Sequence, residues 1–482
     1  IGYIQSGKTA SMEGLISLAK DNGFQIIILL SGVVSNLTKQ TVDRVFTSTP
    51  GAGWNKIYEK DLSKFDIEGL TSDIIRCLKG YENTPEDYMR NETSLIIQMK
   101  NKTRINKLTD LFNNLNSRYD LSKVSCLIID DEGDQHSLSA VNPRIDNQTI
   151  HIAGKEDTVE SICEKYIISE DELIYLNRDK TSEESGNLHI KPGDSLIIER
   201  AESPIHRALR ELRKSIPNHS FLSYTATPQA SLIIPVIDFL SPKFAIILRP
   251  GEDYTGVNYF FDQNVISNYT RVIPSEELHT YSQERIIPET LHTALKEFII
   301  GVSIGYYHKE DFDGKNRTMM ITPSQKVSEH YKYLNSVREI LENWSEILEM
   351  DNSDSEDLYE DFYRVYLENI KKNYSSNIPE YDDLKKLILK ALQLTKLQEI
   401  NARGQTRIPS INWDNNYSLI LVGGIGLERG YTVEGLTITY MSRPTSSQQD
   451  TVQQRARFAG YRKKYKDLVK IYLTDDLKDF YR

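Results

Sequence analysis

The sequence is poor in cysteine. Its 482 residues contain three cysteines, Cys77, Cys126 and Cys163, and none of them forms a Cys-x-x-Cys pair. A disulfide framework or a zinc cluster needs more cysteines at closer spacing, so the sequence encodes neither. This cysteine usage predicts a reducing, cytoplasmic setting.

Long hydrophobic runs and an excess of positive charge are also absent. The longest apolar runs, such as Ile26–Leu30 and Leu232–Ile237, are far shorter than the ~20 residues that a membrane helix needs, and no N-terminal signal pattern is present. Lys and Arg number 58 against 69 Asp and Glu, which gives a net charge of −11. We therefore expect no membrane association, and a nucleic-acid site would have to be a local basic groove.

The composition is that of a globular protein with more than one domain. Hydrophobic residues make up 39% of the chain and charged residues 26%, well away from the composition of disordered chains. At roughly 100–200 residues per domain, this length predicts two or three domains.

A phosphate-binding motif stands at the start of the chain. Residues 2–9 read Gly-Tyr-Ile-Gln-Ser-Gly-Lys-Thr and match the pattern G-x-x-x-x-G-K-[ST]. In that pattern the loop N–H groups surround phosphates, the lysine reaches the β- and γ-phosphates, and the hydroxyl binds Mg²⁺. A chance glycine turn is the alternative. The predicted nucleotide-binding residues are Gln5, Ser6, Gly7, Lys8 and Thr9, with Thr9 also on the metal.

The flanks of this motif agree with the interpretation on one side. Ala10–Lys20 has the apolar spacing of a helix, which should follow the loop. The strand that should precede the loop is reduced to Ile1, and the chain does not open on Met. We therefore expect a fragment trimmed close to its core, with part of the sheet upstream.

An acidic motif follows a second buried strand. Cys126–Ile129 is an apolar run that ends in Asp130-Asp131-Glu132-Gly133-Asp134. Sheets of α/β proteins place ligands at the carboxyl ends of their strands, so we predict that Asp131 orders Mg²⁺ and that Glu132 polarises the attacking water. Asp134 is predicted to relay to a second domain. An acidic surface turn is the alternative.

Two further strand ends carry candidate contacts to a nucleic-acid backbone. The predicted strand Gln25–Leu30 is followed by a loop and a helix, and Ser94–Gln98 is followed by a small basic cluster. A solvated loop explains the basic cluster equally well. The candidate residues are Ser31, Gln40, Lys100 and Lys102.

The rest of the chain predicts a second α/β domain. Phe221–Pro228 is a strand that ends in hydroxyl residues, and Thr225 and Thr227 could couple the nucleotide site to the second domain. A new α/β pattern then begins, and the acidic stretch Glu349–Asp361 reads as a solvated loop or helix face. The segments of this pattern are Phe298–Ser303, Thr318–Thr322, and the predicted helices Val327–Asn343 and Asp382–Gln398.

The last third contains two motifs suited to phosphate or nucleic acid. A strand at Ser418–Val422 leads to a glycine-rich loop with Arg429 and Gly430, which permits close approach of the backbone to phosphate. Gln453–Arg462 places three arginines on a predicted helix and its C-terminal turn. An arginine from a second domain could neutralise charge on the γ-phosphate. A solvated helix face is the alternative.

This ordered set of motifs resembles the superfamily-two helicases and translocases, and more closely the Z-one domain ATPases of bacteria. The likeness spans nearly the whole chain apart from one insertion. Its five stretches are Ile4–Thr9, Ile129–Asp134, Tyr224–Pro228, Arg429–Leu436 and Phe458–Arg462.

The resemblance implies two RecA-like parallel-sheet domains, ATP and Mg²⁺ between them, a nucleic-acid substrate, with DNA expected, and a role in restriction-like or anti-phage defence. The family is also labelled as an endonuclease. Ala456 and Ala459 depart from the sequence pattern of the family. Arg457 and Arg462 are both candidates for the arginine finger, the arginine that reaches the γ-phosphate. Gly430 is expected near the nucleotide, and Arg429 is expected to couple the domains.

The segment between the acidic motif and Thr-Ala-Thr-Pro resembles a LysM domain, a small α+β module. The match is carried by Asp157-Thr158, Leu173–Asn177 and Pro192–Leu196 in a strand-helix-helix-strand order. LysM modules generally bind N-acetylglucosamine polymers. A protein-contact or regulatory module is the interpretation we favour here.

The predicted domain boundaries follow from these motifs. Domain one is 1–147 and 200–285, the insertion is 148–199, and domain two is 286–482, with a helical acidic insertion around 343–400.

Three functions are consistent with these motifs. The first is an ATP-driven nucleic-acid translocase, and the second is an ATP-dependent switch or scaffold that recruits a nuclease without moving along DNA. An intrinsic nuclease would need a further carboxylate–lysine cluster, for which Glu92 with Lys100 and Lys102 is the candidate. Partner proteins of a defence system are expected in the first two cases.

Overall fold

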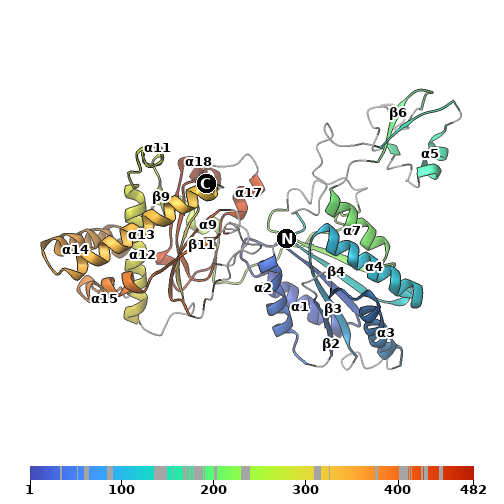
Figure 1. The fold of residues 1–482 in the computed structure, drawn as a ribbon, viewed down its shortest axis with the longest axis horizontal. Helices are drawn as coiled ribbons and strands as arrows, with labels where there is room; N and C mark the ends of the chain where they lie inside the picture. The colour runs from blue at the N-terminus through green and yellow to red at the C-terminus, as the bar shows by residue number, and fades with distance from the viewer. Residues whose placement is uncertain are drawn as a thin grey trace. The chain divides into compact units, whose positions relative to one another are not determined.

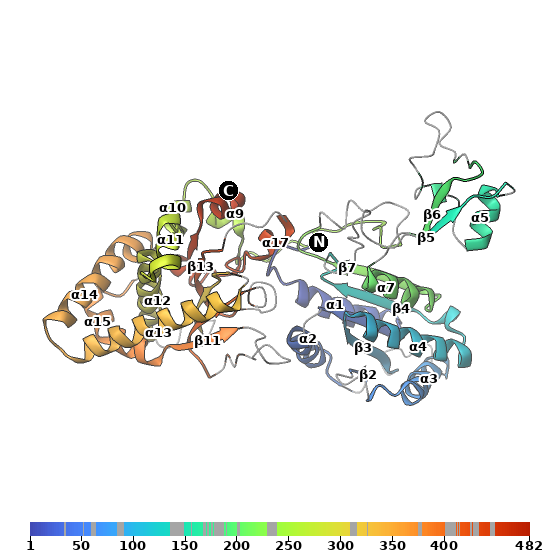
Figure 2. The same cartoon turned by 45° about the horizontal axis from the view of Figure 1, so that its top comes forward.

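The computed structural model forms two compact units, which are described separately (Figures 1 and 2). The first is built mainly from residues 10–32 and 40–246. The second holds Ile247–Arg482 together with the short segment Gly2–Thr9. The structure describes residues 1–32, 35–51, 53–58, 64–83, 91–134, 149–155, 157–166, 170, 173–174, 177, 188, 190–199, 203–228, 239–308, 316–324, 326–374, 378–400, 411, 413, 415–424, 427, 433–443 and 449–482.

The first unit is built on a five-stranded sheet in which every strand pair is parallel, with the order β2-β3-β1-β4-β7. Its central strand β1 is buried along its whole length, as expected for a parallel sheet covered on both faces. The strands are β1 (Ile26–Ser31), β2 (Trp54–Ile57), β3 (Thr93–Met99), β4 (Cys126–Asp131) and β7 (His219–Tyr224).

Helices cover both faces of this sheet because successive side chains of a strand point to opposite sides. Ile26, Ile28 and Leu30 pack with α3, α4 and α7, whereas Ile27 and Leu29 pack with α1 and α2 (Figure 1). The helices are α1 (Lys8–Asp21), α2 (Ser35–Ser48), α3 (Ile67–Asn83), α4 (Lys102–Arg118) and α7 (Pro204–Lys214), with a short 3₁₀ turn η2 (Leu121–Lys123) before β4. The predicted helix Ala10–Lys20 is thus α1.

His219, the first residue of β7, is held as a neutral imidazole. Its Nδ1 lies 2.6 Å from the carbonyl of Ile216, and its Nε2 accepts a hydrogen bond of 3.0 Å from Nε of Arg213. A ring that donates through one nitrogen and accepts through the other carries no charge. Burial lowers the pKa of His219 below its ordinary value of 6.5.

We therefore expect acid to destabilise the first unit through His219. The native chain binds this proton less readily than the unfolded chain, so the stabilisation is present above about pH 6.5 and is lost as the pH falls below it. Denaturant unfolding between pH 8 and 5 should show a flatter pH dependence in His219→Gln than in the wild type. His279→Gln, which changes an exposed histidine, is the control. An unchanged slope in His219→Gln would contradict the assignment.

The segment between β4 and α7 forms a small separate core. Strands β5 (Thr149–Ile152) and β6 (Ser195–Glu199) pair antiparallel, with helix α5 (Val159–Tyr166) between them in the sequence. Asn177 joins the core to β6, because its side chain donates to the carbonyl of Ile197 at 2.8 Å and accepts from the same residue's N–H at 2.7 Å. Most of the predicted second helix lies outside the described residues. The LysM resemblance therefore stays a prediction.

The second unit is built on a six-stranded sheet with the order β11-β12-β10-β13-β15-β9, again with every pair parallel. Its strands are β9 (Thr270–Val272), β10 (Arg317–Ile321), β11 (Lys396–Ile400), β12 (Ser418–Gly423), β13 (Leu436–Met441) and β15 (Lys470–Leu473). A separate antiparallel pair joins β8 (Tyr254–Thr255) to β14 (Gly460–Tyr461). Two parallel sheets in an α/β architecture confirm the predicted fold class.

A layer of long helices covers one face of this second sheet. Met319, Ile321, Ile420 and Val422 share one large core with α12, α13, α14 and α15, while a smaller core around Met320 and Leu421 covers the other face. The helices are α9 (Val257–Phe260), α10 (Ile266–Tyr269), α11 (Ser275–Glu284), α12 (Glu289–His308), α13 (Val327–Glu349), α14 (Ser353–Val365), α15 (Tyr381–Leu394), α17 (Gln449–Gln454) and α18 (Asp475–Tyr481), with short turns η4 (Tyr366–Ile370), η5 (Lys371–Asn373) and η6 (Lys466–Leu468).

The division between the units differs from the predicted one. Residues 247–285 belong with the second unit, so the boundary lies at 246/247 and not at 285/286. The reason is β9, which pairs with β15 in the second sheet. A strand of three residues is too short to show a pattern in the sequence.

Two other predicted segments lie in helices. Phe298–Ser303 is the buried middle of α12, and the acidic stretch Glu349–Asp361 falls largely on α14.

Candidate nucleotide-binding site

The glycine motif forms a tight loop that leads directly into α1. Gln5 and Gly7 have φ values of 53° and 92°, in the left-handed region that glycine adopts without steric cost. The N–H of Ser6 donates to the carbonyl of Tyr3 at 3.2 Å, and Nζ of Lys8 donates to the same carbonyl at 3.2 Å. The loop thus folds back on itself, with Lys8 and Thr9 as the first two residues of the helix.

Two polar side-chain atoms of this loop are buried without a hydrogen-bond partner among the described residues. They are Oγ of Ser6 and Nε2 of Gln5. A buried polar atom without a partner is costly, and such atoms are rare unless a ligand or water satisfies them. Together with the start of a helix, where backbone N–H groups are unpaired, they fit the phosphates of a nucleotide.

Residues 2–9 belong to the second unit by their contacts. Three side chains of that unit hold the loop. The hydroxyl of Tyr254 donates to the carbonyl of Ile4 at 2.7 Å, and that of Tyr461 donates to the carbonyl of Ser6 at 3.1 Å. Nη2 of Arg462 donates to Oε1 of Gln5 at 3.2 Å. Arg462 is therefore placed against a residue of the predicted phosphate loop.

Arg462 is itself fixed by its neighbours. It is buried, its Nη1 donates to the hydroxyl of Tyr465 at 2.6 Å, and its Nη2 donates to the carbonyl of Arg457 at 3.1 Å. Gln453–Arg462 was predicted as a helix and its C-terminal turn, and the helix α17 ends already at Gln454. Gly460 has a φ of 144° and pairs with Thr255 in the β14–β8 pair, so the chain cannot continue as a helix. Arg429 and Gly430 lie outside the described residues.

The acidic motif stands at the carboxyl end of β4, as predicted. Asp130 is buried, whereas Asp131, Glu132 and Asp134 are partly exposed. Glu132 has a φ of 52°, which is unusual for a residue with a side chain. A Cβ at Gly133 would meet Oγ of Ser223 at 1.8 Å, so the turn passes directly against β7 and requires glycine there.

The structure brings three of the predicted coupling residues together: Asp134, Thr225 and Thr227. Oγ1 of Thr227 donates to Oδ2 of Asp134, and the N–H of Thr227 donates to Oγ1 of Thr225 at 2.9 Å. The end of β7 also meets α1, because the hydroxyl of Tyr224 lies 3.3 Å from Oγ of Ser11. The acidic motif, the Thr-Ala-Thr-Pro segment and Ser11 of α1 thus share one edge of the sheet.

The four candidate nucleic-acid residues fall into two groups. Lys102 is exposed at the start of α4, and Gln40 is partly exposed on α2. Ser31 is buried, and its hydroxyl donates to the carbonyl of Gln98 at 3.3 Å. Lys100 is also buried, and its ammonium is bound to the acidic motif. The interpretation of Ser31 and Lys100 as surface contacts is therefore corrected.

The carboxylate–lysine cluster considered for a nuclease is not assembled. Glu92 directly precedes β3 and pairs with Nη1 of Arg76 at 2.7 Å, whereas Lys100 directly follows the same strand. Seven strand residues at ~3.3 Å each separate these positions, which lie at opposite edges of the sheet. Among the described residues, no group of three or more His, Cys, Asp or Glu side chains could hold a metal ion.

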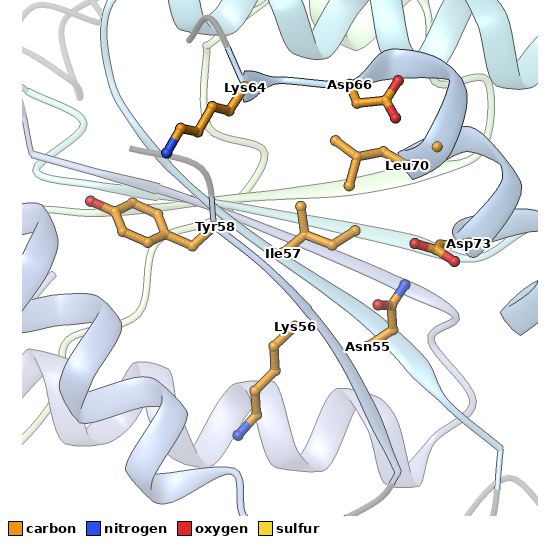
Figure 3. Close-up of a pocket in the computed structure, with 9 residues that line it drawn as sticks. Asn55, Lys56, Ile57, Tyr58, Lys64, Asp66, Leu70 and Asp73 are labelled. Atoms are coloured by element: carbon orange, nitrogen blue, oxygen red, sulfur yellow. The ribbon is translucent and has the colours of Figure 1, made fainter. Parts of the chain in front are cut away.

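A cavity of about 290 Å³ lies elsewhere, between the edge strand β2 and α3 (Figure 3). It is lined by residues of both charges, including Lys56, Lys64, Asp66 and Asp73. None of the residues predicted for the nucleotide site lines it.

In the described part of the chain, no helix combines the length and the apolar character that crossing a bilayer requires.

Sequence reasoning missed Tyr254 and Tyr461, and it assigned Lys100 to a contact with nucleic acid and not to the acidic motif. Tyr254 carries no local signal. Tyr461 stands beside Arg462 in the Phe-Ala-Gly-Tyr-Arg stretch, so its position could have drawn attention to it. Each acts through a contact with a segment distant in the sequence, which a local pattern does not report.

Comparison with known proteins gives a family match and distant structural matches. The family model of the Z1 domain matches residues 290–482, less than half of the chain. The crystal structure of the Pyrococcus furiosus Hef helicase domain is 11% identical, with a TM-score of 0.34 and coverage of 100% of this chain and 93% of that chain. No curated protein matches. The residues that match the Z1 model lie in the second unit, from α12 to α18, in agreement with the resemblance seen in the sequence.

Proposed function

We propose that the protein is an ATP-hydrolysing, helicase-like motor that acts on nucleic acid, with DNA as its substrate. The observation that carries the proposal is the phosphate loop, in which the buried atoms Nε2 of Gln5 and Oγ of Ser6 have no hydrogen-bond partner among the described residues. The acidic motif and Tyr224, which meets the first turn of α1, lie at one edge of the first sheet. That combination is the one used by nucleotide hydrolases of this motif class.

Each residue of the site has a distinct role in this proposal. Lys8 neutralises the β- and γ-phosphates, and Glu132 orients the attacking water. Thr9 and Asp131 would hold Mg²⁺, which supplies charge neutralisation at the phosphates. Arg462 is the favoured finger candidate over Arg457, because its Nη2 already contacts Gln5 of the phosphate loop. Gly430 would lie near the nucleotide.

Coupling of hydrolysis to domain motion is assigned to the hydroxyl segment and the acidic motif. The bond between Thr227 and Asp134 supports this assignment, and Arg429 and Thr225 are proposed to act with them. Lys102 and Gln40 remain the candidates for contact with the nucleic-acid backbone. A role in anti-phage defence with partner proteins, and protein contact as the role of the insertion, rest on the sequence resemblances alone.

The proposal predicts that ATP turnover by the full chain rises on addition of DNA. Steady-state phosphate release should be measured without nucleic acid and with single-stranded DNA, duplex DNA and RNA. Stimulation by DNA and not by RNA is expected. ATP turnover that no nucleic acid changes would contradict the proposed substrate, and no turnover under any condition would contradict the proposed enzyme.

Triplex displacement separates a motor from a switch. A motor that moves along duplex DNA should displace a third strand in an ATP-dependent way, because it must pass the triplex. A switch or scaffold that recruits a nuclease would hydrolyse ATP and leave the third strand bound. The motor is the outcome we expect.

A further inference from the structure

A buried lysine lies beneath the acidic motif, and the proposed reaction does not account for it. Lys100 follows β3 directly, and its side chain is 1% exposed. We infer that Lys100 is a positioning residue that fixes the backbone of the acidic motif, so that Glu132 is held ready to orient water. The inference rests on the proposed ATP hydrolysis and adds a residue to it.

The ammonium of Lys100 makes three hydrogen bonds to consecutive residues of the motif. Nζ donates to Oδ1 of Asp130 at 2.8 Å, to the carbonyl of Asp131 at 2.8 Å and to the carbonyl of Glu132 at 2.9 Å. An ammonium has three N–H donors, so one side chain with its full set of donors binds three successive residues. Both carbonyls are thereby turned toward the interior of the first unit.

This arrangement explains the unusual backbone of Glu132. Its left-handed φ of 52° costs conformational energy for a residue with a side chain. The bond from Lys100 to the carbonyl of Glu132 and the bond from the N–H of Gly133 to the carbonyl of Tyr224, at 3.0 Å, hold the two sides of the peptide group that joins Glu132 to Gly133. The carboxylates of Asp131 and Glu132 stay partly exposed while their backbone is fixed.

Stability alone does not explain a charged pair at this place. Lys100 and Asp130 are each 1% exposed, and replacing a buried ion pair with apolar residues is often neutral or stabilising. What an apolar pair cannot supply is a donor for the two main-chain carbonyls. The pair is therefore best explained by the geometry it imposes on the motif.

The test compares Lys100→Met, Lys100→Arg and the double variant Lys100→Met/Asp130→Leu with the wild-type chain. Lys20→Met is the matched control, because Lys20 is another buried lysine of the first unit and donates to a main-chain carbonyl, that of Asn91, at 2.8 Å. Asn91 precedes β3, so the control lies at the opposite edge of the sheet. The readouts are the melting temperature, the Kd of a fluorescent ATP analogue, kcat and KM for ATP, and amide exchange at Gly133.

We expect Lys100→Met to lower kcat by about 10–100-fold, the usual effect of removing a residue that orients a catalytic group, with little change in the Kd of the analogue. The double variant should regain the melting temperature lost by Lys100→Met and leave kcat low. Lys100→Arg, which keeps the charge but not the geometry, should fold and also have a lowered kcat. Lys20→Met should lose stability without a comparable loss of kcat.

Recovery of kcat together with stability in the double variant would overturn the inference, because the role of Lys100 would then be structural. Should the double variant not fold, Lys100→Arg decides, and a wild-type kcat in it would overturn the inference as well. The rate of amide exchange at Gly133 distinguishes a failure of the positioning role of Lys100 from a failure of the proposed ATP hydrolysis. Faster exchange at Gly133 in Lys100→Met, in a chain whose wild type hydrolyses no ATP, would support the positioning role and reject the hydrolase.

Discussion

Replacing Glu132 with glutamine should lower kcat for ATP hydrolysis by ~10²–10⁴-fold, the usual contribution of a positioned acid or base, and should leave the affinity for ATP near the wild-type value. Glutamine keeps the length and shape of the side chain and loses the carboxylate that would polarise water. The hydrogen bond from Lys100 to the carbonyl of Glu132 and the one from the N–H of Gly133 to the carbonyl of Tyr224 remain available in the variant. Phosphate release and titration with a fluorescent ATP analogue measure the two quantities.

Glu92→Gln is the matched control for this prediction. Glu92 lies beside the same sheet but at its opposite edge, where it pairs with Arg76. The kcat of Glu92→Gln should therefore equal that of the wild type. Equal activity in Glu132→Gln and the wild type would show that the water is activated by another group. A lowered affinity for the analogue in Glu132→Gln would instead point to a role in binding.

The strand ends were the most predictable part of the site. The apolar runs at Gln25–Leu30, Ser94–Gln98 and Cys126–Ile129 became β1, β3 and β4, because a strand buried on both faces reads as a continuous hydrophobic run. Sheets of α/β proteins place ligands at the carboxyl ends of their strands, so the residues after β4 were expected at that edge of the sheet. That reasoning located the acidic motif correctly.

The environment of Lys100 could not be predicted in the same way. A lysine after a strand is normally exposed, and the burial of this one depends on Asp130, which is 30 residues away in the sequence. The pairing of β3 with β1 and of β1 with β4 brings the two residues together. Only the strand order, which no local pattern contains, distinguishes this lysine from its exposed neighbour Lys102.

The contacts of the phosphate loop show the same limit over a greater distance. Gln5 and Arg462 are separated by 457 residues, and the β8–β14 pair that orients Tyr254 and Tyr461 has two residues per strand. Strands this short carry no periodic signal. The motifs were recognisable because their residue types are fixed by chemistry, whereas the residues that hold them are fixed only by the fold.

Replacing Lys8 with alanine should weaken both nucleotide binding and turnover, with kcat/KM for ATP lowered by ~10²–10³-fold, the usual effect of removing one donor to a developing oxyanion. Lys8 is the first residue of α1, and alanine is at least as favourable as lysine in a helix. The stability of the chain without nucleotide should therefore change little, and the loss should appear only when ATP is added.

Thermal unfolding with and without ATP tests this without relying on turnover. At a concentration of 100 Kd, a ligand that binds only the folded chain stabilises it by about 2.7 kcal/mol. If Lys8→Ala raises Kd about 100-fold, the same ATP concentration stabilises the variant by about 0.4 kcal/mol by the same relation. Lys20→Met, whose side chain lies in the last turn of the same helix, should keep the full ATP-dependent shift. An equal shift in Lys8→Ala and the wild type would mean that the nucleotide does not bind at this loop.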